Sequence, residues 1–177
     1  MPRAPWSVLV IVFLGCGPPS YPAAVPHALL GRALPELHHI RALGGQKLDA
    51  ADLAGHPVVV KFFAQYCAPC MVTLPEAERI HHDHADVIFL GVDEDEGAEA
   101  AQALVARFGL TFPVVHDTSN VLSGRFRVAT LPATFVADRS GVVQWVGGEG
   151  QTGDDLERAV AAAASSPVPA PAAPANR

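Results

Sequence analysis

A Cys-x-x-Cys pair closely follows a run of mostly apolar residues, and this placement constrains the chain more than any other feature. The run is Val58–Phe63, and the cysteines are Cys67 and Cys70. A nearly continuous apolar run of this length is typical of a strand that is covered on both faces. If a helix begins at Cys67, both sulfurs lie on one helical turn, and the helix N-terminus favours a thiolate at Cys67. The pattern therefore predicts a thiol–disulfide redox site.

The two cysteines have different expected roles because they occupy different positions in the predicted helix. Cys67 is expected to be the nucleophile, since it lies at the helix start. Cys70 lies one turn further in, so we expect it to be more buried and to act as the resolving thiol. It would attack a mixed disulfide formed on Cys67. We expect no metal and no cofactor other than this redox-active disulfide.

Length, composition and charge fit one domain of ordinary size with appendages. The chain has 177 residues, half of them hydrophobic, which is enough to build a core. Its formal net charge is −6 and it contains no basic patch, so nucleic acid is not an expected partner. We interpret the acidic excess only as a source of solubility, and we expect a monomer.

Alternating strand and helix signals occupy residues 32–164. Their order predicts an α/β sandwich in which a mixed central sheet is flanked by helices. Pro75 is expected to kink the helix that carries the cysteines. The predicted elements are a hairpin within 37–48, a helical turn at 49–53, strands at 58–63, 87–92 and 112–116, helices at 67–82, 97–108 and 119–126, a strand hairpin of 133–137 and 142–146, and a helix at 154–164.

Both ends of the chain differ in composition from this domain. Residues 1–15 have a positive start and a short apolar core, which indicates an export signal. The stretch Phe13-Leu14-Gly15-Cys16 resembles the bacterial lipoprotein signal, which implies a lipid on Cys16 and membrane anchoring. The alternative is a secretory signal cut within the Ala23-Ala24 region, which would discard Cys16. Residues 16–31 are predicted to be a Pro/Ala-rich tether, and 165–177 a disordered Pro/Ala-rich tail.

Two separate motifs resemble the thioredoxin superfamily. The stretch from Phe62 to Cys70 is similar to its active-site segment, and Thr130-Leu131-Pro132-Ala133 looks like the segment that carries its cis-proline. The region 34–53 resembles the N-terminal hairpin extension of TlpA/ResA-like proteins, and the predicted helix at 97–108 resembles their inserted helix. The resemblance, which spans about Leu34 to Gly150, implies a thioredoxin-like sandwich. It also implies that cis-Pro132 presents the backbone of Leu131 beside Cys67, where an extended substrate could add.

The resemblance further implies an extracytoplasmic reductase of exported, cysteine-containing proteins, for example in cytochrome c maturation. Its electrons would come from a membrane reductase. Gly17 follows Cys16, and the aspartate that retains lipoproteins at the inner membrane is missing there, so we expect the periplasmic side of the outer membrane in a Gram-negative cell. One alternative is an oxidase or isomerase of exported proteins. Another is a copper carrier that uses Cys67 and Cys70 as soft ligands.

Three positions depart from the patterns of the resembled proteins. Lys61 replaces an acidic residue of thioredoxin, and a buried cation there would favour thiolate and make the disulfide more oxidising. The alternative is that Lys61 reaches the surface or pairs with a carboxylate. Thr73 replaces a glutamate that is frequent in TlpA-like helices, so no catalytic base is assigned. Tyr66 replaces a usual tryptophan. Tyr66, Ala68, Pro69 and Leu131 are expected to tune the site or contact substrate.

Three further features of the sequence have simpler interpretations than a metal site or a peroxidase. The cluster His81-His82-Asp83-His84 is expected to be a solvated helix end rather than a metal site, and a zinc site joining two of its histidines to both cysteines conflicts with the helical pattern. The run Asp93-Glu94-Asp95-Glu96 is interpreted as a solvated loop that precedes a helix, with calcium as a weaker alternative. Peroxidase chemistry is rejected because Ala64 replaces the required threonine.

Overall fold

A five-stranded mixed sheet forms the centre of the computed structural model, which describes residues 19–38 and 40–168. Its strand order is β5-β4-β3-β6-β7. Strand β3 (Val58–Phe63) lies in the middle, parallel to β4 (Ile88–Asp93) and antiparallel to β6 (Ala133–Ala137). Strand β5 (Val114–His116) extends the parallel side, and β7 (Val143–Gly147) pairs antiparallel with β6. The predicted mixed sheet is confirmed.

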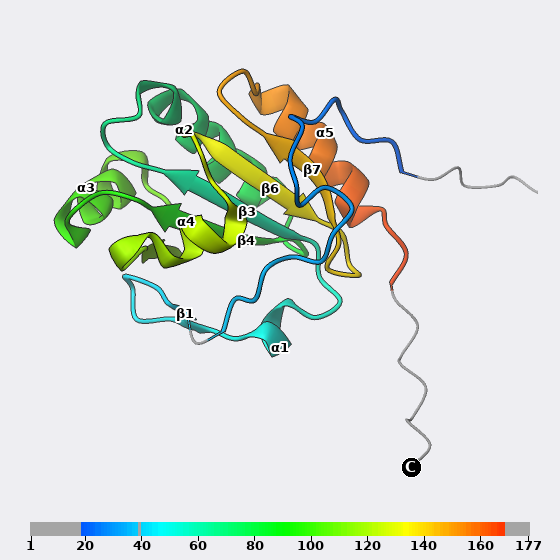
Figure 1. The fold of residues 1–177 in the computed structure, drawn as a ribbon, viewed down its shortest axis with the longest axis horizontal. Helices are drawn as coiled ribbons and strands as arrows, with labels where there is room; N and C mark the ends of the chain where they lie inside the picture. The colour runs from blue at the N-terminus through cyan, green and yellow to red at the C-terminus, as the bar shows by residue number, and fades with distance from the viewer. Residues whose placement is uncertain (1–18, 39, 169–177) are drawn as a thin grey trace, which may run out of the picture.

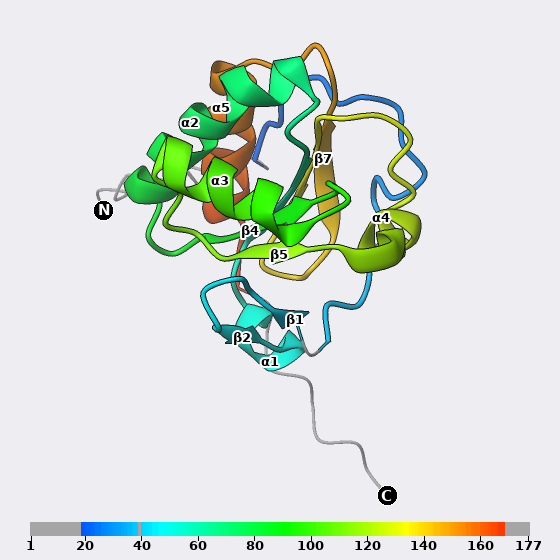
Figure 2. The same cartoon turned by 90° about the vertical axis from the view of Figure 1, so that its left-hand side faces the viewer.

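Helices cover both faces of this sheet (Figures 1 and 2). Helices α2 (Ala68–Asp83), α3 (Ala98–Phe108) and α5 (Gly153–Ala164) lie on one face. Helix α4 (Val121–Phe126), preceded by a 3-10 turn at Thr118–Asn120, lies on the other. The flanked sandwich predicted from the sequence is therefore confirmed.

Alternation along β3 divides the core into two halves. Because successive side chains of a strand point to opposite faces, Val59 and Phe63 pack under α2 and α5, whereas Val60 and Phe62 pack under α4. Lys61 occurs between Val59 and Phe63 in this alternation and is only 1% exposed. Lys61, which can carry a positive charge, therefore lies in the apolar half of the core that also contains Cys70.

The predicted N-terminal extension is present as a small hairpin and a helical turn. Strand β1 (Ile40–Arg41) pairs antiparallel with β2 (Lys47–Leu48), and α1 (Ala50–Leu53) follows. Helix α1 begins after Asp49, whose side chain and that of Asp52 form a reciprocal capping box. Figure 2 shows this extension below the sheet, away from the end of β3 that leads to the cysteines.

The described part of the predicted tether is not a free linker. Val25 N–H donates to Val146 O at 2.8 Å, Gly31 N–H donates to Val143 O at 2.8 Å, and the Trp145 indole donates to Ala23 O at 3.2 Å. Strand β7 is at the sheet edge, so its outward backbone groups need partners, and this segment supplies several of them. Composition does not reveal such edge pairing, so these hydrogen bonds were not predicted from the sequence.

Several sequence predictions lie outside the described residues. They are the signal at residues 1–15, the lipidation site Cys16 and most of the predicted tail, residues 169–177. The described beginning of that tail is partly ordered by contacts. The Ser166 hydroxyl donates to Ala163 O at 2.6 Å and accepts from the Arg139 N–H at 3.3 Å, which fixes the end of α5 against the turn after β6.

A substitution at Gly91 in β4 would test the packing on the α2 side of the sheet. A Cβ at this position would lie 3.0 Å from side-chain atoms of Phe63, Phe112 and Val114. We expect Gly91→Ala to lower the free energy of unfolding by about 1–3 kcal/mol, as overpacked cores do. Gly124→Ala is the matched control, since a Cβ there meets nothing within 4 Å and alanine favours helix. Urea denaturation checks both, and equal stabilities would contradict the packing described.

Candidate redox site

Cys67 and Cys70 are joined in a disulfide at the start of α2. Their Cα atoms are 5.2 Å apart. Cys67 is the N-cap residue of α2, and its sulfur accepts a hydrogen bond from the Cys70 N–H at 3.2 Å. Cys67 is 6% exposed, whereas Cys70 is fully buried. This difference agrees with the predicted order of attack, in which an incoming partner meets Cys67 first.

A groove of 420 Å³ opens beside Cys67. The Leu131–Pro132 peptide bond on one side of this groove is cis, as the resemblance implied. The predicted contact residues Tyr66, Ala68, Pro69 and Leu131 all line the groove. The full lining is Tyr66, Cys67, Ala68, Pro69, Glu94, Val128, Ala129, Thr130, Leu131 and Glu149. The arrangement gives a substrate cysteine an approach to Cys67 along a surface formed by four separate parts of the chain.

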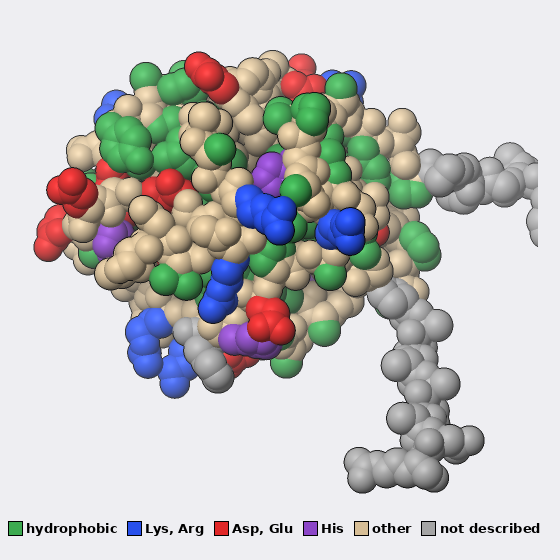
Figure 3. Space-filling view, in the orientation of Figure 1, with side chains coloured by type: hydrophobic (Ala, Val, Ile, Leu, Met, Phe, Trp, Pro, Cys, Tyr) green, Lys and Arg blue, Asp and Glu red, His purple; other side chains and the backbone are tan. Residues whose placement is uncertain are grey.

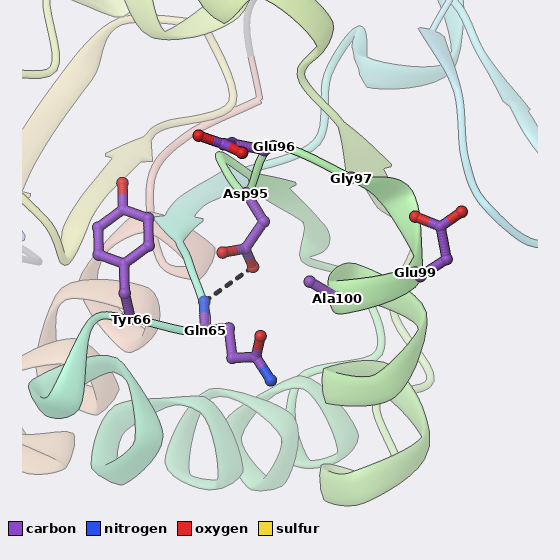
Figure 4. Close-up of a pocket in the computed structure, with 7 residues that line it drawn as sticks. All are labelled: Gln65, Tyr66, Asp95, Glu96, Gly97, Glu99 and Ala100. Carbon is purple, nitrogen blue, oxygen red and sulfur yellow. Dashed lines mark hydrogen bonds between the residues drawn. The ribbon is translucent and has the colours of Figure 1, made fainter.

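Tyr66 separates this groove from a second hollow of 550 Å³. Tyr66 is 73% exposed, so it does not pack in the core. Figure 4 shows the hollow between the Gln65–Tyr66 segment and the start of α3, with Asp95 pointing inward. The Gln65 N–H donates to the Asp95 carboxylate at 2.8 Å, which ties the segment before Cys67 to the loop after β4.

Lys61 lies in the interior and does not reach the surface, which removes one of the alternatives considered above. Its Nζ donates to Thr134 Oγ1 at 3.3 Å across the β3–β6 pair. Among the residues that the structure describes, no carboxylate makes an ion pair with it. Burial lowers the pKa of Lys61 to about 7, and the nearby charge of Glu76 opposes that shift. Near neutral pH this amine is therefore divided between its charged and neutral forms.

The acidic run that begins at the last residue of β4 is only partly the solvated loop that we predicted. Asp93 is fully buried, and one of its carboxylate oxygens lies 3.0 Å from His116 Nδ1. Burial raises the pKa of Asp93 to about 6, with the His116 hydrogen bond acting in the opposite direction. The sequence signal for this burial was the position of Asp93, which directly follows the apolar run 87–92. Its burial follows from the pairing of β4 with β5.

The histidine cluster does not converge on one point. His82 lies 3.0 Å from Glu78, and His84 lies 2.7 Å from Glu157. The His81 ring packs against Phe89 and Phe112. The cysteines and the histidines occupy opposite ends of α2, about 20 Å apart at the helical rise per residue, so they cannot share one zinc ion.

Comparison with known proteins gives the family. The AhpC/TSA family matches residues 30–146, well over half of the chain. The chain belongs to the AhpC/TSA family. Within it, the chain is 33% identical over 118 residues to the thiol–disulfide oxidoreductase ResA of Bacillus thuringiensis strain Al Hakam, covering 65% of this chain and 68% of that protein.

Solved structures related to this AhpC/TSA protein have the same architecture. A secreted Mycobacterium tuberculosis disulfide oxidoreductase, described as homologous to E. coli DsbE, is 25% identical, with a TM-score of 0.64 and coverage of 70% of this chain and 93% of that one. A thioredoxin-family thiol:disulfide interchange protein from Chlorobium tepidum is 24% identical, with a TM-score of 0.67 and coverage of 81% and 100%. It supports the fold alone.

These findings make the AhpC/TSA protein a TlpA/ResA-like thiol–disulfide oxidoreductase with a thioredoxin-like fold. Its substrates are proteins that contain cysteine. The Cys67–Cys70 pair supplies the chemistry. We expect the Cys67 thiolate to attack a substrate disulfide and Cys70 then to displace the substrate thiolate as the Cys67–Cys70 disulfide forms. The reverse sequence transfers the disulfide to a substrate dithiol.

Two parts of the site were not found from the sequence. Glu149 lies in the loop between β7 and α5, about 80 residues after Cys67 along the chain, yet it lines the same groove. Glu99 and Ala100 line the second hollow because α3 begins there. None of these three residues belongs to a motif, so only the folded arrangement reveals them.

Thr73, which occupies the position of a glutamate in TlpA-like helices, donates to the Pro69 carbonyl at 3.3 Å. It offers no carboxylate, so it does not supply the proton acceptor for Cys70.

Proposed function

We propose that this protein works outside the cytoplasm as a reductase of exported, cysteine-containing proteins, such as those handled in cytochrome c maturation, and takes electrons from a membrane reductase. One observation carries the proposal: Cys67 borders an open groove while Cys70 lies fully buried behind it. Such a pair can accept a partner on one sulfur and release it with the other. One relative, named thiol–disulfide oxidoreductase ResA, supports the activity, and the Mycobacterium tuberculosis structure, described as secreted, supports the location outside the cytoplasm.

The proposal includes attachment to a membrane through a lipid on Cys16, with the outer membrane as the expected location in a Gram-negative cell. Its basis is the lipoprotein-like stretch that ends at Cys16. Across residues 19–38 and 40–168, the structure contains no helix with the length and apolar character needed to cross a bilayer. Palmitate labelling of a Cys16→Ser variant in the producing cell, compared with the unchanged chain, would test the attachment.

Lys61 favours the second candidate, an oxidase or isomerase of exported proteins. When protonated, Lys61 is a buried cation on the side of β3 that faces Cys67 and Cys70. Such a cation stabilises a thiolate, and this makes the disulfide easier to reduce. The two candidates differ in the direction of electron flow, which follows from the reduction potential of the pair.

The redox equilibrium of Cys67–Cys70 against glutathione separates the two directions. For a reductase we expect a potential near that of thioredoxin, about −270 mV, at pH 7. A value near about −120 mV would contradict the reductase and favour the oxidase. The equilibrium can be read by mass spectrometry after alkylation, in a Cys16→Ser background so that only two thiols report. Insulin reduction with and without a chemical electron donor supplies the corresponding activity.

A further inference from the structure

The substrate groove and the hollow beside it are strongly acidic. Glu94 and Glu149 line the groove, and Asp95, Glu96 and Glu99 line the hollow. Neither lining contains Lys or Arg, although Arg127 precedes Val128 of the groove in the chain. Figure 3 shows acidic side chains at the edge of the molecule that α3 occupies in Figure 1, whereas Lys and Arg lie mainly over the middle and lower part of that face. Negative charge is thus concentrated where a partner must approach.

Apolar side chains are exposed around the same cysteine. Tyr66 is 73% exposed and Val72, on the first turns of α2, is 65% exposed. Leu131 and Val128 add apolar surface to the opposite wall of the groove. An apolar centre with a charged rim is the usual composition of a protein-binding surface. The five carboxylates make that rim uniformly negative, so a partner that fits it must be positive.

One carboxylate of the groove has an unused acceptor. The Oε1 atom of Glu94 is buried and has no hydrogen-bond partner among the residues that the structure describes. Burial raises the pKa of this carboxyl group, a hydrogen bond with Ser123 opposes the shift, and the charge of Asp117 adds to it. A buried acceptor left without a donor is unfavourable. A cationic donor that enters the groove beside Glu94 would meet an attractive field.

We propose that the acidic groove and hollow select polypeptide segments that carry Lys or Arg next to the reacting cysteine. This selection rests on the proposed function, because it concerns the partner that exchanges a disulfide with Cys67. The cysteine of the segment lies at Cys67, and its basic side chains reach Glu94 and Glu149 on one side of Tyr66 and Asp95, Glu96 and Glu99 on the other. The attraction acts mainly on the rate of encounter, so it decreases with ionic strength.

Peptides that differ only in the charge beside one cysteine test the selection. Each peptide carries its cysteine as a disulfide with 2-nitro-5-thiobenzoate, flanked by two Lys, two Glu or two Gln. The full-length chain carries Cys16→Ser and Cys70→Ala, so that Cys67 is its single thiol. The Cys67 thiolate forms a disulfide with the peptide sulfur and expels the coloured aryl thiolate, and its absorbance gives the rate. Rates with mercaptoethanol correct for the intrinsic reactivity of each peptide.

We expect the corrected rate for the Lys peptide to exceed that for the Glu peptide by about ten-fold or more at low salt and by less than about three-fold in 0.5 M salt. The double variant Glu96→Gln/Glu149→Gln neutralises one exposed carboxylate in the hollow and one in the groove. It should lower the preference for the Lys peptide over the Glu peptide about three-fold. Glu36→Gln/Asp154→Asn is the matched control. It removes the same charge outside both linings and should leave the preference unchanged.

The outcomes separate the two proposals. Equal corrected rates for the Lys and Glu peptides would overturn the charge selection while leaving disulfide exchange at Cys67 intact. A preference that Glu96→Gln/Glu149→Gln lowers no more than the control variant does would have the same meaning. A wild-type Cys67 that reacts with none of the three peptides would overturn both the selection and the proposed function.

Discussion

Replacing Cys67 by serine is expected to abolish disulfide exchange, with a loss of about a thousand-fold or more in the rate of insulin reduction. The reason is chemical. Exchange requires a thiolate that attacks a disulfide sulfur, and a serine hydroxyl does not ionise near neutral pH and cannot form the mixed disulfide. Cys67 also borders the groove, whereas Cys70 is fully buried, so Cys70 cannot replace it there.

Cys70→Ser provides the matched control for this prediction. It removes the other sulfur of the same disulfide, and therefore the same cross-link, but leaves the Cys67 thiol at the groove. We expect it to lose multiple turnover and yet to accumulate a mixed disulfide with substrate, because nothing resolves the adduct. If the two variants were equally inactive toward an activated disulfide in a single turnover, the assignment of Cys67 as nucleophile would be wrong.

Lys61→Met is expected to change both the potential of the disulfide and the pH dependence of stability. Methionine keeps the volume of the buried side chain but removes its charge. At pH 6, where Lys61 is mostly protonated, the variant should have a reduction potential lower by about 30 mV, equivalent to about 1.4 kcal/mol for a two-electron couple. Near pH 9 the wild-type amine is neutral, so the difference between the two proteins should become small.

The stability effect of Lys61 follows from linkage. Its pKa is lowered to about 7 in the folded chain from the ordinary value of 10.5. Between these values the unfolded chain binds a proton that the folded chain lacks, so the free energy of unfolding rises with pH, by about 1.4 kcal/mol per pH unit from this group. Below pH 7 both states hold the proton and Lys61 adds no slope. Lys61→Met should remove the slope between pH 7.5 and 9.5.

Lys47→Met is the matched control, since Lys47 is the only other lysine of the chain and is exposed. It should leave both the potential and the slope of stability with pH unchanged. Urea denaturation across the pH range and glutathione equilibria at pH 6 and 9 supply the two measurements. A potential that is the same in Lys61→Met and wild type at pH 6 would show that the buried amine does not act on the cysteines.

Much of the fold follows from local signals in the sequence. The run Val58–Phe63 forms β3, as expected for a strand that is covered on both faces and is therefore apolar at nearly every position. The strand at Ala133–Ala137 was predicted with its observed bounds. Helix α3 ends at Gly109, which adopts the left-handed conformation that glycine allows. Each of these elements depends on the residues within it and at its ends.

The parts that the sequence did not predict depend on contacts between distant residues. The segment 19–31 has the composition of a linker, but the open edge of β7 gives its backbone hydrogen-bond partners. Lys61 had two opposed interpretations, since a long side chain in a strand can either remain inside or extend to solvent. The packing of α2 and α5 over β3 decides for the interior.

The redox pair itself was predictable because its chemistry depends on short spacing, whereas its surroundings were not. Cys67 and Cys70 are three residues apart, so one helical turn brings them together. Glu149 and Glu99 reach the same site from the loop before α5 and from α3. No spacing in the sequence connects them to Cys67, and the acidic character of the groove therefore became visible only in the folded chain.

The most direct measurement is the identification of the sulfur that carries a trapped substrate. A full-length Cys70→Ser chain, also carrying Cys16→Ser, is mixed with insulin or another disulfide-containing protein, quenched in acid and digested for mass spectrometry. We predict a disulfide between Cys67 and a substrate cysteine, formed within one turnover and released by dithiothreitol. A chain that remains unmodified at Cys67, although it is folded and its substrate is in excess, would contradict the account.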